Sequence, residues 1–160
     1  MKYHHLLFVF TLSQFAFAES PKAFTDVPFG ASLEEARAAL TSRKELKPGE
    51  VSATLLTFTG GTFSGQPVSH WTFKFVGNKF ALGSAHIDNV KKPVYDDLKD
   101  QLTKKYGKPD SEKGHNSYEC RWVFRSNGQR TIRLDYDYKG KVDVTYTLDS
   151  LAKAGEKEDL

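Results

Sequence analysis

The sequence predicts an α+β domain in which two amphipathic helices pack on one face of an antiparallel sheet of about six strands. Three observations lead to this fold class: segments with helical spacing of apolar residues, segments in which apolar and polar residues alternate, and glycine-containing turns between the alternating segments. The helix-then-strands order occurs twice, which suggests two α-βββ halves. A chain of 160 residues corresponds to one domain.

The N-terminal segment 1–18 has the pattern of a secretory signal peptide. A weakly basic start precedes an apolar run over 6–12, and Ala16-Phe17-Ala18 supplies the small residues that a signal peptidase accepts. The run is shorter than the roughly 20 apolar residues of a membrane-spanning helix. We therefore expect cleavage after Ala18 and a periplasmic or secreted protein. No cysteine lies near the cleavage site, so no stable membrane anchor is expected.

Composition limits what the mature chain can be. Residues 19–148 carry the helix and strand patterns of a single α+β domain, and 149–160 read as a charged C-terminal tail. The net charge of +3 is too small to indicate a nucleic-acid-binding protein. The single cysteine, Cys120, excludes a disulfide framework and a cysteine-based zinc site. We expect a buried, unreactive thiol there, with an intermolecular disulfide as the alternative.

Two segments predict helices, each with a recognisable beginning. Ser32 and Glu35 have the spacing of a capping box at the first helix. Pro93 suits the first position of the second helix, and Gly107 suits its left-handed C-terminal residue. The apolar residues expected on the core faces of the two helices are Leu33, Ala36, Leu40, Tyr95, Leu98, Leu102 and Tyr106.

The first strongly alternating segment predicts a hairpin with a two-residue turn at Gly77-Asn78. In that register the opposed pairs are Phe75–Phe80, Phe73–Leu82 and Trp71–Ser84. The large apolar side chains then gather on one face of a half-buried sheet. The same register places His70 and His86 on opposite faces, so we expect that they cannot share a metal ion.

The last third predicts a meander of three strands over 117–148. Three-residue loops that end at Gly128 and Gly140 keep the apolar residues on one face, whereas a two-residue loop would mix the faces. The expected pairs are Trp122–Ile132, Cys120–Leu134, Tyr136–Val142 and Leu134–Val144.

The outer face of this meander is a candidate metal site. Its register places Glu119, Asp135 and Asp143 side by side, and three carboxylates can bind a hard cation such as calcium. The alternative is a solvated, salt-bridged sheet face, in which Arg121 and Arg133 in the neighbouring row compensate the acids diagonally.

The glycine-rich stretch 59–65 predicts a long mobile loop between strands. It lacks the Lys-Ser/Thr of a phosphate-binding loop. Its Phe63, with Gly61 and Gly65 nearby, is our candidate contact with a partner, since binding residues often lie on loops. We expect Phe63→Ala to weaken partner capture while leaving the melting temperature nearly unchanged.

No set of residues in the sequence converges on a catalytic site, and no Ser/His/Asp order has the context of a nucleophile motif. We therefore expect an exported, non-catalytic module, without a cofactor, that binds a protein or an envelope component. The alternative is a small-ligand or calcium-binding protein that uses the acidic row.

Parts of the chain resemble a group of known proteins. The segments 98–109 and 29–36, with Trp122 and Tyr146 on strands, are similar to small exported bacterial proteins of uncharacterised function. The helix-then-strands plan more remotely resembles small outer-membrane-assembly lipoproteins and β-lactamase-inhibitor proteins. This chain has neither a lipid-acceptor cysteine nor a disulfide pair. The resemblance implies a fold and an exported location, and it carries over no site residues.

Overall fold

The computed structural model describes residues 19–115, 117–126 and 128–158. The predicted signal peptide, residues 1–18, lies outside the described residues. No helix in the described part of the chain is long and apolar enough to cross a membrane.

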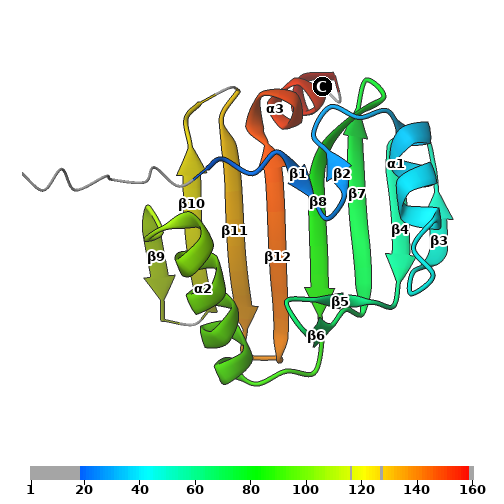
Figure 1. The fold of residues 1–160 in the computed structure, drawn as a ribbon. Coiled ribbons are helices and arrows are strands. Elements are labelled where there is room, and N and C mark those ends of the chain that lie inside the picture. Colours follow the sequence, from blue (N-terminus) through cyan, green and yellow to red (C-terminus); the bar gives the residue numbers. More distant parts are fainter. Residues whose placement is uncertain (1–18, 116, 127, 159–160) are drawn as a thin grey trace, which may run out of the picture.

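The fold is α+β, and its main sheet is antiparallel with eight strands in the order β3-β4-β7-β8-β12-β11-β10-β9 (Figure 1). The strands are β3 (Lys47–Val51), β4 (Leu55–Thr59), β7 (His70–Val76), β8 (Lys79–Ile87), β9 (Ser111–Gly114), β10 (Ser117–Phe124), β11 (Arg130–Asp137) and β12 (Lys141–Leu148). The fold class was predicted, but the expected number of strands was too small. The two edge strands, β3 and β9, are exposed along their whole length and lack the alternation that reveals a strand.

Two small hairpins and two helices cover one face of this sheet. The hairpins are β1 (Ala23–Phe24) with β2 (Val27–Pro28), and β5 (Thr62–Phe63) with β6 (Gln66–Pro67). The helices are α1 (Leu33–Thr41) and α2 (Lys92–Tyr106), and the core lies between these four elements and the sheet (Figure 1). We call this the inner face and the opposite one the outer face.

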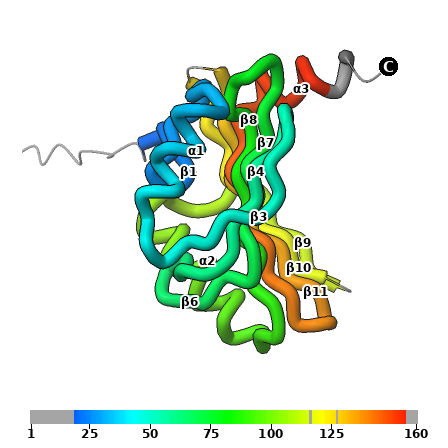
Figure 2. Tube along the Cα trace, turned by 90° about the vertical axis from the view of Figure 1, so that its right-hand side faces the viewer, coloured from blue at the N-terminus to red at the C-terminus, as the bar shows by residue number. Residues whose placement is uncertain are grey.

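A third helix, α3 (Asp149–Glu158), packs on the outer face, opposite α1 and α2 (Figure 2). This helix is formed by residues 149–158, which we expected to be a charged tail. That expectation was wrong for these residues. The reason lies in small residues: Gly155 approaches Val76 so closely that a Cβ would meet its side chain at 2.8 Å. A helix with a small-residue face can lie flat on the sheet, and its charged residues concealed this from the sequence pattern.

The predicted capping signals of α1 are present. Ser32 Oγ accepts a hydrogen bond from Glu35 N, and the Glu35 carboxylate accepts one from Ser32 N, which completes the capping box. Gly77 and Asn78 form the predicted two-residue turn, with φ of 52° and 59°. Asn78 Oδ1 also accepts from Leu33 N at 3.1 Å, so this turn ties the β7–β8 hairpin to the start of the helix.

The predicted strand register is confirmed in the β10–β11–β12 meander, and it is wrong for most of the β7–β8 hairpin. All four predicted pairs of the meander are observed, including Trp122 opposite Ile132 and Cys120 opposite Leu134. In the β7–β8 hairpin, Phe75 lies opposite Phe80 as predicted, but the register then shifts by one residue. The pairs beyond the shift are Lys74–Leu82, Phe73–Gly83, Thr72–Ser84, Trp71–Ala85 and His70–His86.

The shift is a β-bulge at Ala81. It moves the residues of β8 after Ala81 to the face of the sheet opposite to the one predicted. A bulge places two residues of one strand against one residue of the other. Ala81 is buried together with Phe80, which a small apolar residue allows. Gly83 then faces the core opposite Phe73, and the Phe24 ring fills the space beside it, since a Cβ on Gly83 would lie 2.1 Å from Phe24 Cδ1.

Candidate functional site

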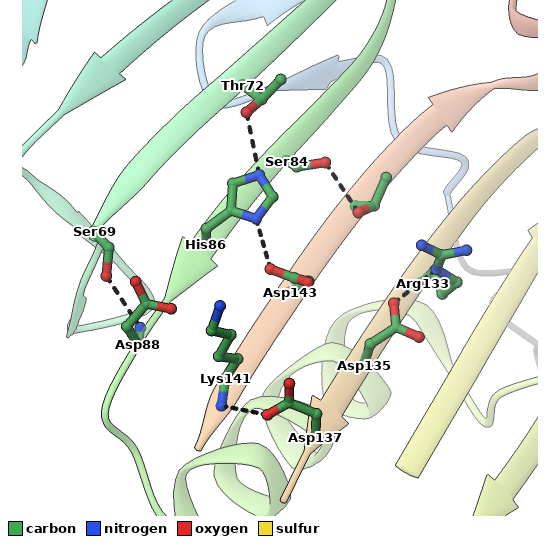
Figure 3. A network of polar contacts seen from close by, with 11 residues as sticks. Ser69, Thr72, Ser84, His86, Asp88, Arg133, Asp135, Asp137, Lys141 and Asp143 are labelled. Carbon is green, nitrogen blue, oxygen red and sulfur yellow. Dashed lines mark hydrogen bonds and ion pairs between the residues drawn. The ribbon is translucent and has the colours of Figure 1, made fainter. Parts of the chain in front are cut away.

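A row of ionisable side chains crosses the outer face of the sheet, and Figure 3 shows three of its members, Asp135, Asp143 and His86. Each member lies opposite the next on the neighbouring strand, from β10 to β7. We call this the polar row; it consists of Glu119, Asp135, Asp143, His86 and His70. The sequence predicted that the three carboxylates are neighbours, and it missed the two histidines that continue the row.

The histidines lie on the same face, contrary to the sequence prediction. The rings of His70 and His86 stack with centroids 4.0 Å apart and an angle of 10° between their planes. Partial burial and the neighbouring His86 lower the pKa of His70. The signal that could have revealed this pair is Ala81, because a bulge at that position moves every later side chain of β8 to the opposite face of the sheet.

His86 connects a hydroxyl to a carboxylate. Its Nδ1 lies 2.6 Å from Asp143 Oδ1, and its Nε2 lies 3.2 Å from Thr72 Oγ1 (Figure 3). The hydrogen bond from His86 lowers the pKa of Asp143. Hydroxyl, imidazole and carboxylate stand in the order of a catalytic triad. However, none of these residues lines the cleft between α2, β1 and β5 or the cleft beside α3.

Two of the three carboxylates of the polar row have an arginine neighbour, and the third, Asp143, is bonded to His86. Asp135 Oδ2 accepts from Arg133 Nε at 2.7 Å, and Glu119 Oε1 lies 3.5 Å from Arg121 Nη2. Burial raises the pKa of Asp135, while Arg133 opposes that shift. The two arginines therefore compensate the acids as predicted in kind, but each pairs along its own strand, two residues away, and not diagonally across strands.

A metal ion at the predicted calcium site would have to compete with these cations. No group of three His, Cys, Asp or Glu side chains in the described ranges is arranged to hold a metal ion. Calcium binding by Glu119, Asp135 and Asp143 stays a prediction.

The inner face contains a cleft of about 370 Å³ bordered by α2, β1 and β5. We call it the aromatic cleft, because its apolar lining is mostly aromatic: Phe24, Phe63, Trp71, Leu102, Tyr106 and Tyr146. Its polar lining includes Thr25, Arg43, Ser64, Gln101 and Lys105. Clefts of this size with an apolar floor and a few polar groups are the usual form of binding sites.

Phe63, the predicted partner contact, lies in this cleft. It belongs to the β5–β6 hairpin, whose turn is formed by Ser64 and Gly65 with φ of 49° and 81°. The Phe63 ring is partly buried and packs against Phe24 at 6.5 Å and Trp71 at 6.4 Å. The stretch expected as a long mobile loop is thus a short, packed hairpin.

The two predicted glycines have different surroundings. A Cβ on Gly61 would meet Leu46 at 3.0 Å, so this glycine permits close packing behind the hairpin. A Cβ on Gly65 would meet no atom within 4 Å in the described part of the chain, so its role there is to supply the positive φ of the turn. Neither glycine needs a partner to explain its presence.

The cations of the aromatic cleft differ in how far they are neutralised. Arg43 pairs with Glu45 at 2.7 Å and with Asp26 at 3.4 Å. Lys105 forms no ion pair among the residues that the structure describes, and its Nζ lies 5.1 Å from the centre of the Tyr106 ring. Burial and the Tyr106 hydroxyl raise the pKa of Tyr146, so its hydroxyl keeps its proton and can donate a hydrogen bond. Lys105 is therefore the cation available to an acidic ligand.

Cys120 lies outside both sites. Its side chain is buried in the core, and Sγ lies 3.0 Å from the Tyr95 hydroxyl. Burial raises the pKa of the thiol, which agrees with the predicted unreactive cysteine and leaves Sγ out of reach of a second chain.

Comparison of the chain with protein-family models, with curated protein sequences and with solved structures returned no significant match, so the resemblance to small exported proteins stays a prediction.

Proposed function

We propose that the protein is an exported, non-catalytic module that binds a protein partner in the aromatic cleft. The partner inserts one apolar side chain against the aromatic floor and places an acidic side chain next to Lys105. The observation that carries the proposal is the combination of aromatic floor and uncompensated cation within one cleft. Export is part of the proposal and follows from the pattern of residues 1–18.

The floor of the cleft supports an apolar anchor. Phe63, Trp71 and Tyr146 line the cleft from β5, β7 and β12, so the floor combines two strands of the main sheet with the β5–β6 hairpin. Partners commonly anchor in such pockets with one aromatic or aliphatic side chain, which supplies most of the binding energy.

The rim supports an acidic neighbour for that anchor. Lys105 and Gln101 lie one turn apart on α2, and both line the cleft. Lys105 offers a charge, and Gln101 offers both a donor and an acceptor of hydrogen bonds. A partner segment with an acidic residue close to its anchor would satisfy both groups.

Site-specific photocrosslinking tests the proposal. A photoreactive amino acid replaces Gln101, which is exposed and lines the cleft, in the natural host cell. The matched control replaces Asp100, which is also exposed on α2 but does not line the cleft. We expect a crosslinked protein from position 101 and none from position 100.

A charge reversal makes this experiment specific to the cleft. Lys105→Glu in the same background is expected to abolish the crosslink, because an acidic partner residue would then face a carboxylate. A crosslink that persists in Lys105→Glu, or that forms equally from position 100, would contradict the proposal. Absence of any crosslinked protein from position 101 would contradict it as well.

A further inference from the structure

A second cleft, of about 440 Å³, lies on the outer face where α3 meets the ends of β10, β11 and β12. We call it the α3 cleft. It is on the opposite side of the sheet from the aromatic cleft, as the position of α3 in Figure 2 shows. Its lining includes three cationic side chains, Arg121, Arg133 and Lys153, and three threonines.

Two of these cations face each other directly. Arg121 on β10 lies opposite Arg133 on β11, and like charges at opposed positions destabilise a sheet. Each guanidinium pairs with one carboxylate of the polar row: Arg121 Nη2 lies 3.5 Å from Glu119 Oε1, and Arg133 Nε lies 2.7 Å from Asp135 Oδ2. Each guanidinium has five N–H donors, so most of the donors of this pair remain available.

One donor of the pair has no protein acceptor within reach. Arg121 Nε is buried, and no hydrogen-bond partner for it occurs in the described ranges. A buried donor without a partner costs about 1–3 kcal/mol, and more when it is charged. A bound anion would remove the repulsion between the two arginines.

Among the described residues that line the α3 cleft, the single carboxylate accepts two hydrogen bonds. Asp149 Oδ2 accepts from Gln129 Nε2 at 2.6 Å and from Thr131 Oγ1 at 2.8 Å. Lys153, one helical turn after Asp149, is exposed and forms no ion pair among the residues described. The described lining of this cleft therefore carries three cations against one carboxylate.

We propose that the α3 cleft binds a tetrahedral oxyanion, a phosphate or sulfate group, between Arg121 and Arg133 with Lys153 at its entrance. The planar guanidinium is suited to such anions because it offers two parallel N–H donors to two oxygen atoms. The site is separate from the aromatic cleft, so this inference does not depend on the proposed protein partner.

Calorimetric titration of the full chain tests the site, with inorganic phosphate, inorganic sulfate and glycerol phosphate as probes. Sodium chloride at matched ionic strength controls for screening. We expect saturable binding that weakens about ten-fold in Arg121→Gln, the size expected for loss of a charge-assisted hydrogen bond. Arg125→Gln removes the same charge from a neighbouring, exposed arginine outside the cleft and should bind like the wild type.

The probes distinguish the sources of the anion. Tighter binding of glycerol phosphate than of inorganic phosphate indicates a phosphate carried on a larger ligand, and equal binding of phosphate and sulfate indicates a general oxyanion site. Lys153→Gln, which changes only an exposed side chain, supplies a second variant if Arg121→Gln does not fold. A heat of binding no larger than that of sodium chloride would overturn the proposal. So would a loss of affinity in Arg125→Gln as large as the losses in Arg121→Gln and Lys153→Gln.

Discussion

The rings of His70 and His86 stack 4.0 Å apart because the bulge at Ala81 brings these residues opposite each other on β7 and β8. Both lie at one end of the polar row, and His86 is bonded to Asp143. Two imidazoles at this distance disfavour a second positive charge. The stack is therefore a pH-sensitive element of the sheet.

We expect the melting temperature to fall as the pH drops below about 6.5 because of His70. Its pKa in the folded state lies below the unfolded value of about 6.5. A lowered histidine pKa means that the fold favours the neutral ring, so this stability is complete above the unfolded pKa and decreases as the pH falls through the folded pKa. Lys141 strengthens the shift, whereas Asp88 and Asp143 oppose it. Thermal melts of His70→Gln should show a smaller decrease over this range; an unchanged slope would contradict the role of His70.

Two neighbouring carboxylates of the polar row should respond oppositely to neutralisation. The pKa of Asp143 is lowered by His86, so its charged form stabilises the fold at neutral pH, and Asp143→Asn should cost about 0.5–1 kcal/mol. The pKa of Asp135 is raised by burial, so its charged form is unfavourable, and Asp135→Asn should be neutral or slightly stabilising. Urea unfolding of both variants and the wild type at pH 7 measures the change in the free energy of unfolding for each substitution. Equal losses in the two variants would contradict this assignment.

Calcium should leave the melting temperature unchanged at millimolar concentration. Arg133 and His86 already satisfy Asp135 and Asp143, and an ion would have to displace both. A ligand that binds only the folded state must raise its stability, so differential scanning fluorimetry with calcium and with magnesium decides the question. A saturable shift with calcium that is lost in Asp135→Asn would support the calcium site predicted from the sequence.

Gly83→Ala should destabilise the protein by about 2–3 kcal/mol, the upper range for overpacking of a core. Its new Cβ would lie 2.1 Å from Phe24, which is 1% exposed and surrounded by Trp71 and Phe73. Combining Gly83→Ala with Phe24→Leu should cost less than the sum of the two single changes, which a double-mutant cycle measures. Additive losses would show that the two positions are not in contact.

The structure revises the prediction for Phe63. Its ring packs against Phe24, Trp71 and Tyr146, so Phe63→Ala should cost about 1–3 kcal/mol instead of leaving the melting temperature unchanged. Ser64→Ala in the same hairpin serves as the control, with an expected change below about 0.5 kcal/mol. Equal melting temperatures for Phe63→Ala and the wild type would place this ring outside the core.

Local rules predicted most of the fold. The capping box at Ser32 and the glycine loop at Gly140 each depend on a few consecutive residues, and both are observed. Alternation over 117–148 was strong enough to set the register of three strands. The edge strands β3 and β9 could not be predicted in this way, because neither of their faces is buried.

The candidate sites were less predictable, because each depends on contacts between distant segments. The carboxylate neighbours of the polar row followed from one meander, but His86 joined them only through the β8–β12 pairing and the Ala81 bulge. The aromatic cleft brings Phe24, Phe63 and Tyr106 together from three separate elements. The α3 cleft was hidden, because residues 149–158 read as a charged tail.

Native mass spectrometry of the untagged protein, released gently from its natural compartment, tests the central claim most directly. We predict the mass of residues 19–160 together with a second polypeptide, and the loss of that polypeptide in Lys105→Glu. A complex with a small molecule in place of a polypeptide would contradict the proposed protein partner. Retention of the polypeptide in Lys105→Glu would show that the partner binds elsewhere than in the aromatic cleft.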